Sequence, residues 1–311
     1  MGQGGGRIYL ADMKVLDGSA LAKTIKAEVA EEVAAFVAQG HRAPHLVAVL
    51  VGEHPASASY VRNKVRSCEE VGIESTTLRM PAETTQAELL GQVEALNRDP
   101  KVDGFIVQLP LPDRIDALAV TLAIDADKDV DGFHPLNFGR MAQGLEAFLP
   151  ATPSGIVQML HRNGIETSGK HAVVLGRSTI VGTPMSILLS RKAPTGNATV
   201  TLCHSRTRDL PSVLRSADIL IAAIGRAEFV TKDMVKPGAV VIDVGINRVD
   251  DTSRKRGYRL VGDVDYAGVA EVASAITPVP GGVGPMTVVS LIQNTLRAAR
   301  RAADKSIPRP T

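Results

Sequence analysis

The chain has 311 residues, a length that corresponds to two domains of about 150 residues each. Its composition, with 44% apolar and 22% charged residues, is close to the globular average and excludes a disordered chain, a fibrous repeat and a disulfide scaffold. The charges nearly balance, with 35 basic and 33 acidic residues, and no apolar run reaches the ~18 residues of a membrane-spanning helix. We therefore expect neither nucleic-acid nor membrane binding.

The first half of the chain alternates short apolar segments with segments of helical periodicity, which is typical of α/β units. Ser19 is expected to cap the first helix, and Gly40 to end it. The next elements are expected as a strand at 45–51, a helix at 58–71, a strand at 74–78, a helix at 85–97, a strand at 104–109 and a helix at 116–124. They make three α/β units, and a polar loop at 125–135 follows them.

The second half begins near Pro150 and continues the alternation, so the predicted class is α/β with a mostly parallel sheet. Strands are expected at 172–175, 198–203, 219–224 and 239–244, with an edge strand at 260–263. Helices are expected at 154–163, at 184–191, before Ala217 and at 286–303. The charged segment 248–260 is interpreted as a surface hairpin or loop, and the ends, 1–10 and 305–311, as flexible.

One strand-to-helix turn has the features of a phosphate site. An apolar strand runs into residues 176–184, where Gly176 and Gly182 precede a helix that starts at Pro184. Backbone N–H groups at such a helix start can meet a phosphate. Ser178 and Val181 stand where a dinucleotide fingerprint has its second and third glycines, so an ordinary turn is an equally good interpretation of the motif alone.

The end of the following strand favours NADP over NAD. Sites for NAD usually carry an acidic residue there, to bind the ribose 2′-hydroxyl, but residues 203–207 contain none. Ser205 and Arg206 could accept a 2′-phosphate, and Arg177 could reach the same place, because a guanidinium binds phosphate as a fork. The alternative is that these arginines are merely solvated loop residues.

Two further segments carry groups suited to chemistry. Tyr60 and Lys64 are four residues apart and share a helix face, where the lysine could carry a proton or act as a fixed cation. The alternative is an exposed lysine beside a half-buried tyrosine. Gln108 comes near the carboxyl end of an apolar strand, the edge at which α/β sheets bind ligands, or it simply caps a loop.

Two loops could hold a flat or polar ligand. Asp127, Asp129 and Asp131 alternate as in a calcium loop, but the twelfth position is Phe138 where that loop needs glutamate, so we expect no metal. A carboxylate that binds a polar heterocycle is at least as plausible here. The segment 277–287 is rich in proline and glycine, so its backbone can approach a flat ligand closely, or it is only a rigid turn.

Taken in order and spacing, nine segments resemble the bifunctional methylenetetrahydrofolate dehydrogenase/cyclohydrolase family. The segments are 60–64, 107–112, 127–135, 151–155, 176–184, 203–207, 241–247, 260–264 and 276–287. The resemblance implies a catalytic domain of residues 11–149 and 286–304, in which the C-terminal helix packs back on the first half. It also implies a Rossmann-like NADP-binding domain of residues 150–285, a folate site between the two domains and a homodimer.

The resemblance further implies two reactions: NADP oxidises 5,10-methylenetetrahydrofolate to the 5,10-methenyl cation, and water opens that cation to 10-formyltetrahydrofolate. By matching motifs, Lys64 is the expected catalytic lysine, Gln108 its hydrogen-bonding neighbour, Tyr60 the residue that orients the folate and Asp131 the one that binds the pterin. The expected NADP-binding residues are Gly176, Arg177, Ser178, Gly182, Ser205 and Ile246. The folate site would also include Val107, Leu109, Pro280, Gly281, Gly282 and Pro285.

Other functions stay open beside this one. The chain could be a monofunctional dehydrogenase of the same family, an NADP-dependent dehydrogenase of a small hydroxy acid, or an NADP-binding regulator without activity. The segments 191–199 and 250–259 are longer than usual for the family, which leaves the dimer contact undetermined. Because Cys68 and Cys203 are far apart and the N-terminus lacks the apolar stretch of a secretory signal, we expect a cytoplasmic protein.

Overall fold

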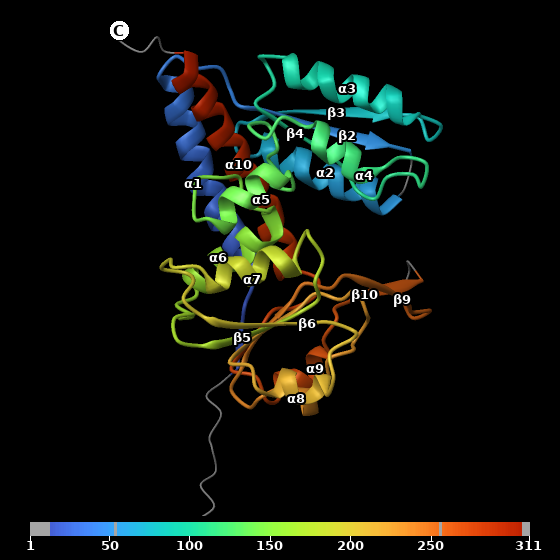
Figure 1. Ribbon diagram of the computed structural model, residues 1–311, viewed down its shortest axis with the longest axis vertical. Helices are drawn as coiled ribbons and strands as arrows, with labels where there is room; N and C mark the ends of the chain where they lie inside the picture. Colours follow the sequence, from blue (N-terminus) through green and yellow to red (C-terminus); the bar gives the residue numbers. More distant parts are fainter. Residues whose placement is uncertain (1–12, 53–54, 255–256, 307–311) are drawn as a thin grey trace, which may run out of the picture. The chain divides into compact units, whose positions relative to one another are not determined.

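The structure is a computed structural model that describes residues 13–52, 55–254 and 257–306. The chain divides into two compact units, both visible in Figure 1. One unit comprises Ser19–Gly155 with Pro285–Thr311 and contains a three-stranded sheet; we call it the three-stranded unit. The other comprises Met1–Gly18 with Ile156–Gly284 and contains a six-stranded sheet; we call it the six-stranded unit.

The three-stranded unit is built on a parallel sheet in the order β3-β2-β4. Its strands are β2 (His45–Val51), β3 (Glu74–Met80) and β4 (Gly104–Val107). The central strand reads HLVAVLV and is buried at every position after its histidine, as expected for a parallel strand covered on both faces. The carboxyl ends of β2 and β4 therefore open at the same edge.

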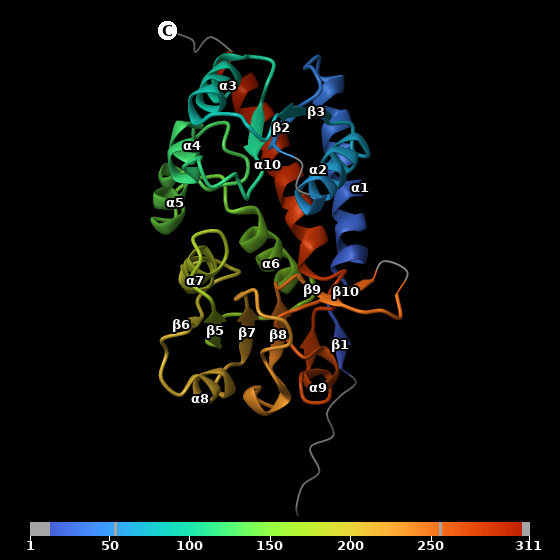
Figure 2. The same cartoon turned by 90° about the vertical axis from the view of Figure 1, so that its right-hand side faces the viewer.

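Helices cover both faces of this sheet. They are α1 (Gly18–Ala38), α2 (Pro55–Glu69), α3 (Gln86–Arg98), α4 (Ala117–Ala123), α5 (Pro135–Ala142), the start of α6 (Ala151–Arg162) and most of α10 (Val283–Ser306). Apolar residues of α3 and α4 pack with those of the sheet in one cluster, and Figure 2 shows α1, α2 and α10 on the other side of the strands. Two of these helices begin with a side-chain N-cap: a capping box at Thr85 precedes α3, and Asp116 caps α4.

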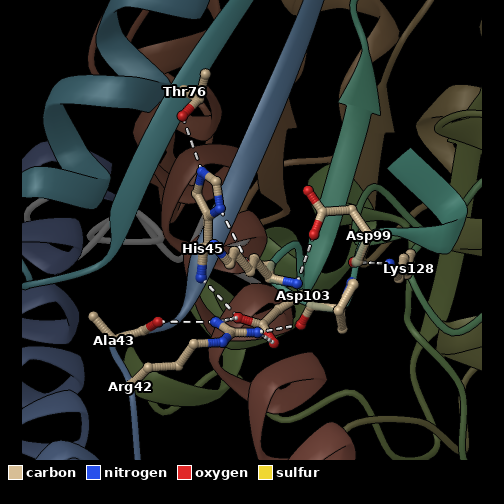
Figure 3. Close-up of polar contacts among 9 residues, drawn as sticks. Arg42, Ala43, His45, Thr76, Asp99, Asp103 and Lys128 are labelled. Atoms are coloured by element: carbon tan, nitrogen blue, oxygen red, sulfur yellow. Dashed lines mark hydrogen bonds and ion pairs between the residues drawn. The ribbon is translucent and has the colours of Figure 1, made fainter. Parts of the chain in front are cut away.

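A polar network fixes the amino ends of β2 and β4 (Figure 3). The carboxylate of Asp103 accepts two hydrogen bonds from Arg42, at 2.7 and 2.8 Å, and one from the backbone N–H of His45, at 2.8 Å. The imidazole of His45 contacts the Lys101 carbonyl at 3.2 Å and the Thr76 hydroxyl of β3 at 2.9 Å. The three strands are thus held in register by side chains as well as by the ladder.

The sheet of the six-stranded unit is parallel throughout, in the order β1-β11-β8-β7-β5-β6. Its strands are β1 (Lys14–Val15), β5 (His171–Leu175), β6 (Thr199–Cys203), β7 (Ile219–Ala222), β8 (Val240–Asp243) and β11 (Ala275–Ile276). Its helices are the rest of α6, α7 (Gly182–Ser190), α8 (Leu210–Arg215), α9 (Tyr266–Ala270) and a short 3₁₀ turn (Lys232–Met234). The chain passes from β5 to β6 on one side and then to β7 on the other, which makes the carboxyl end of β5 a topological switch point.

The first strand of this switch point repeats the network seen at β2. The carboxylate of Asp218 accepts the backbone N–H of His171 at 2.9 Å. The imidazole of His171 contacts the Ser216 carbonyl at 3.0 Å and the Thr201 hydroxyl of β6 at 2.9 Å. In both units, a strand that has a neighbour on each side therefore starts with the same arrangement of histidine, aspartate and threonine.

The predicted fold class is confirmed, and the segment 248–260 forms most of an antiparallel hairpin of β9 (Asn247–Asp250) and β10 (Tyr258–Val261). Four local predictions were wrong. The expected edge strand at 260–263 falls on β10, which pairs with β9 in a separate two-stranded sheet. The first helix begins at Gly18, so Ser19 lies within its first turn; the end of the predicted loop, Pro135, already starts α5; and α10 begins at Val283 instead of residue 286. No sequence pattern predicts β1, which pairs with β11, because a strand of two residues has no periodicity.

The predicted domain limits, 11–149 with 286–304 and 150–285, stay predictions, although the structure places β1 in the six-stranded unit. Residues 1–10 and 307–311, which we expected to be flexible, lie outside the described residues, while Lys305 and Ser306 are the last two residues of α10. Within the described part of the chain, no helix combines the length and the apolar character needed to cross a bilayer.

Candidate active site

Lys64 of α2 lies at the centre of a cluster of polar side chains in the three-stranded unit. The side chain is buried, with the residue only 3% exposed, so the alternative of an exposed lysine is wrong. Its Nζ lies 3.8 Å from Oδ1 of Asp131, 3.5 Å from Oε1 of Gln108 and 5.0 Å from the centre of the Tyr60 ring. The structure thus places four of the predicted residues together, and their roles stay predictions.

The amide of Gln108 is oriented by its neighbours. Its backbone N–H donates to the Val49 carbonyl at 2.9 Å, which extends the β2–β4 ladder by one residue. Its side-chain nitrogen donates to the Leu109 carbonyl at 2.7 Å, so the side-chain oxygen faces Lys64. Gln108 therefore does more than cap a loop: its acceptor oxygen is directed at the lysine.

Tyr60 presents its ring to Lys64 and keeps its hydroxyl buried. Burial and the nearby negative charge of Asp131 raise the pKa of Tyr60 to about 12, while a hydrogen bond with the Thr287 side chain opposes that rise. The phenol therefore stays protonated at neutral pH. Thr287, on α10, is also hydrogen-bonded to Thr152 of α6 at 3.0 Å.

The loop that carries Asp131 is organised by Asp129. This carboxylate is 2% exposed, and burial raises its pKa. Its donors are the backbone N–H groups of Gly132, Phe133 and His134, at 3.1, 3.2 and 2.8 Å, and the side-chain amide of Asn137 at 3.0 Å. Asp129 thus turns into its own loop while Asp131 faces Lys64, an arrangement unlike that of calcium ligands. Within the described residues, no group of three or more acidic, histidine or cysteine side chains could hold a metal ion.

Two cavities border this unit. A small one, of about 20 Å³, is lined in part by Val107, Leu109 and Asp131, three of the residues predicted to contact a ligand. A larger one, of about 520 Å³, includes Asp103 and Lys128 and lies at the amino ends of the strands. Its polar groups are already paired, since Asp103 binds Arg42 and Lys128 donates to two carbonyls. The reactive groups therefore lie at the other edge, where Gln108 follows β4.

In the six-stranded unit, the turn after β5 requires glycine at two positions. Gly176 has a φ of +118°, and a Cβ there would lie 2.0 Å from the Ala223 carbonyl oxygen. A Cβ on Gly182 would lie 1.9 Å from the carbonyl oxygen of Gly176. Ser178 Oγ accepts the N–H of Val181 at 3.2 Å, which closes the turn before α7. The two glycines thus allow a tight strand-to-helix turn of the kind at which phosphates bind, in which Ser178 also accepts the N–H groups of Gly182 and Thr183.

The residues predicted to bind the rest of the nucleotide are exposed around this turn. Leu175 of β5 pairs with Cys203 of β6, so Arg177 and Ser205 each come two residues after the paired strand ends and both are exposed. Ile246 follows β8 and is 58% exposed, which is unusual for isoleucine. These residues all come after the carboxyl ends of parallel strands, the edge that binds ligands in such sheets.

The proline- and glycine-rich segment falls on the boundary between the units. Pro280, Gly281 and Gly282 belong to the six-stranded unit, and Pro285 to the three-stranded unit, within α10. Gly281 has a φ of +106°, and a Cβ on Gly282 would lie 2.6 Å from the Pro278 carbonyl oxygen. The local backbone conformation therefore requires glycine at both positions, independently of any ligand contact.

Two aspartates that the sequence analysis left without a role fix the loops at this edge. Asp243, at the end of β8, accepts the backbone N–H groups of Gly245, Asp263 and Val264 at 2.9–3.0 Å, and burial raises its pKa to about 6. Asp263 in turn accepts from three backbone N–H groups and one side chain, those of Ile224, Gly225, Arg226 and Asn247. Both lie in segments that carry the family resemblance, but the sequence alone does not show that their side chains bind the backbone of these loops.

Comparison with known families now identifies the two units. A model of the tetrahydrofolate dehydrogenase/cyclohydrolase catalytic domain matches residues 16–131, and a model of the NAD(P)-binding domain of the same enzymes matches residues 150–303. The chain belongs to the tetrahydrofolate dehydrogenase/cyclohydrolase family. This confirms the resemblance inferred from the nine segments, and the prediction of a nicotinamide nucleotide as cofactor.

Relatives in the tetrahydrofolate dehydrogenase/cyclohydrolase family are similar along almost their whole length. The bifunctional protein FolD of Chlorobium phaeobacteroides is 57% identical over 93% of this chain and 99% of its own length. FolD of Cytophaga hutchinsonii is 58% identical over 92% of this chain and 99% of its own length.

Solved structures of the same family agree with the fold. The bifunctional FolD of Campylobacter jejuni superposes with a TM-score of 0.87 at 45% identity, over 93% of this chain and 99% of that one. FolD of Trypanosoma brucei, solved with NADP and an inhibitor, gives 0.89 at 39% identity, over 94% of this chain and 99% of that one. Both are described as dehydrogenase/cyclohydrolase enzymes, which speaks against the hydroxy-acid and regulator alternatives.

Proposed function

We propose that this chain oxidises 5,10-methylenetetrahydrofolate to the 5,10-methenyl cation with NADP and then hydrolyses that cation to 10-formyltetrahydrofolate. The observation that carries the proposal is the buried Lys64 Nζ, with Gln108, Asp131 and Tyr60 around it, at the ligand-binding edge of the three-stranded sheet. The FolD relatives, which share more than half of their residues with the chain, support both activities.

For the oxidation, the protein has to position two ligands. NADP, when bound, supplies the acceptor for the hydride that leaves the folate bridge carbon. The transfer needs no acid or base from the protein, so positioning accounts for most of the catalysis. Asp131, whose carboxylate is held in place by the loop that Asp129 organises, would bind the pterin ring. Tyr60 would orient the folate, while Val107 and Leu109 would line its site.

For the hydrolysis, Lys64 would manage the protons. Water adds its oxygen to the methenyl carbon and releases one proton. The bond from that carbon to N5 then breaks while the second proton leaves the hydroxyl oxygen and N5 takes up a proton, so that the formyl group stays on N10 and one proton is released in all. Lys64 Nζ would hold and pass the proton that N5 takes up, and Gln108 would keep Nζ in place through its oriented amide oxygen.

The residues of the six-stranded unit fit NADP. The tight turn between β5 and α7, which needs glycine at 176 and 182, would present its exposed residues 177–180 to the pyrophosphate, with Ser178 closing the turn. Arg177 and Ser205, both exposed at the ends of neighbouring strands, would bind the 2′-phosphate, and Ile246 would contact the nicotinamide end. We propose this binding mode on the exposure of these groups and on the absence of an acidic residue from 203–207.

Four folate contacts, the oligomeric state and the cellular location rest on the resemblance alone. Pro280, Gly281, Gly282 and Pro285 would form a wall of the folate site. A homodimer and a cytoplasmic location are also expected. Light scattering of the purified protein, with a mass near twice that of one chain, would support the dimer; a mass of one chain would contradict it.

A spectroscopic assay tests the proposed function. The protein is mixed with 5,10-methylenetetrahydrofolate and either NADP or NAD, and NADPH and the methenyl absorbance are followed separately. NADPH should rise with little methenyl build-up, since the second activity removes the cation. Methenyl accumulation would instead indicate a monofunctional dehydrogenase, and no NADPH from a folded protein would contradict the proposal.

A further inference from the structure

A pair of threonines joins three helices beside the proposed catalytic lysine. Thr287 of α10 is 9% exposed and is hydrogen-bonded both to the Tyr60 hydroxyl of α2 and to Thr152 of α6, the latter at 3.0 Å. A hydroxyl both donates and accepts, so Tyr60, Thr287 and Thr152 can form a continuous chain of hydrogen bonds. The chain ends on the residue whose ring faces Lys64, with 5.0 Å between Nζ and the ring centre.

The position of Tyr60 depends on this chain for two physical reasons. A helical threonine has two common χ1 rotamers, and the hydrogen bonds of the Thr287 hydroxyl with Thr152 and Tyr60 hold it in one of them. The phenol hydroxyl of Tyr60 is buried, and a buried hydroxyl without a partner is costly, so the tyrosine gains its hydrogen bond only in one orientation. Ring and hydroxyl are thus both fixed, the ring beside Lys64 and the hydroxyl on α10.

The two threonines have different relations to the reaction. Thr287 contacts Tyr60 directly, whereas Thr152 contacts Thr287 and acts only through it. Thr152 is the second residue of α6, and next to it the Ala151 N–H donates to the Asp131 carbonyl at 3.2 Å. The same short segment therefore supports both the tyrosine and the loop of the carboxylate.

We propose that Thr287 is a positioning residue of the cyclohydrolase reaction: its hydroxyl holds the Tyr60 ring against Lys64, and Thr152 fixes the Thr287 hydroxyl. The inference rests on the proposed function, because it assigns a role within that reaction. Thr287 and Thr152 would thus keep the reactive side chains in position without bonding to Lys64 themselves.

Kinetics of methenyl hydrolysis test the proposal with conservative variants. Thr287→Val keeps the shape and removes the hydroxyl, and should lower kcat about tenfold with KM changed less than twofold, as expected for one lost hydrogen bond. Thr287→Ser retains the hydroxyl and should stay within about threefold of wild type. Thr152→Val should lower kcat by about two- to threefold. In a Tyr60→Phe background, Thr287→Val should have almost no further effect.

A second measurement does not depend on activity. With tyrosine labelled at Cζ with ¹³C, the four tyrosines give separate resonances, and that of Tyr60 is the one missing from Tyr60→Phe. Thr287→Val should shift this resonance and leave the other three in place. Full activity of Thr287→Val, an unmoved Tyr60 resonance, or an equal loss in the Tyr60→Phe background would each overturn the inference while leaving the proposed function intact. A wild-type protein without any folate turnover would overturn the proposed function, and this inference with it.

Discussion

Replacing Gly176 by alanine tests the nucleotide turn directly. Two costs can be read from the structure. A non-glycine residue at a φ of +118° is strained by about 1–3 kcal/mol. The new Cβ would also lie 2.0 Å from the Ala223 carbonyl oxygen, more than 1 Å inside an ordinary contact, and relieving such overpacking typically costs about 1–3 kcal/mol. We therefore expect a loss of about 2–6 kcal/mol in the free energy of unfolding.

Two other glycines serve as controls, so that the cost of backbone strain can be measured apart from the cost of steric overlap. Gly169 has a φ of +70° with nothing near its missing Cβ, so Gly169→Ala should cost only about 1–2 kcal/mol of strain. Gly91, inside α3 and equally open, should stabilise the protein by about 0.5–1 kcal/mol when changed to alanine.

Urea denaturation and NADP titration provide the measurements. Gly176→Ala should be the least stable of the three and should bind NADP at least tenfold more weakly, because the turn between β5 and α7 has to move. Gly169→Ala should bind NADP like the wild type. If Gly176→Ala matched Gly169→Ala in both stability and affinity, the reasoning about the close approach would be refuted.

Two further expectations concern the same unit. Arg177→Ala should weaken NADP about ten- to hundredfold and NAD less than twofold, since one charged hydrogen bond to the 2′-phosphate is lost; equal weakening, measured by fluorescence titration, would contradict the assignment. The pKa of Asp243 is raised to about 6, above its value near 3.9 in an unfolded chain, so the native state binds this proton more tightly. The stability contributed by this group therefore grows as the pH falls from about 6 to 4, by up to about 3 kcal/mol, and urea titrations at several pH values should show the wild type gaining on Asp243→Asn in that window. If the stability advantage of the wild type over Asp243→Asn instead shrank as the pH fell through this window, the native carboxylate would be ionised over the whole range.

Much of the fold follows from simple patterns. The run HLVAVLV is apolar at six of seven positions and lies between two turn-like segments, so a buried parallel strand is the natural prediction, and β2 has those bounds. The elements missed are those with too few residues for a period. β1 and β11 have two residues each, and their pairing depends on chain segments more than 250 residues apart.

The candidate site was also partly predictable, because simple spacing patterns place some of its residues. Tyr60 and Lys64 share a helix face, and Gln108 ends a strand, so their types and spacing suggest a common site. Thr287 and Asp129 could not be found in this way, because a threonine in a helix or an aspartate in a polar loop is usually solvated. Only the fold shows that Asp129 caps its own loop and that Thr287 contacts Tyr60.

The proposed hydrolysis depends most on Lys64, so the most direct test is the hydrolysis of 5,10-methenyltetrahydrofolate by Lys64→Met, with NADP affinity measured on the same protein. Lys128→Met is the matched control, because Lys128 is also partly buried but donates to the Leu96 and Asp99 carbonyls at the other edge of the sheet. Lys64→Met should hydrolyse the cation at least about a hundredfold more slowly, with NADP affinity within twofold of wild type, while Lys128→Met keeps its activity. Hydrolysis by Lys64→Met within tenfold of the wild-type rate would contradict the central claim.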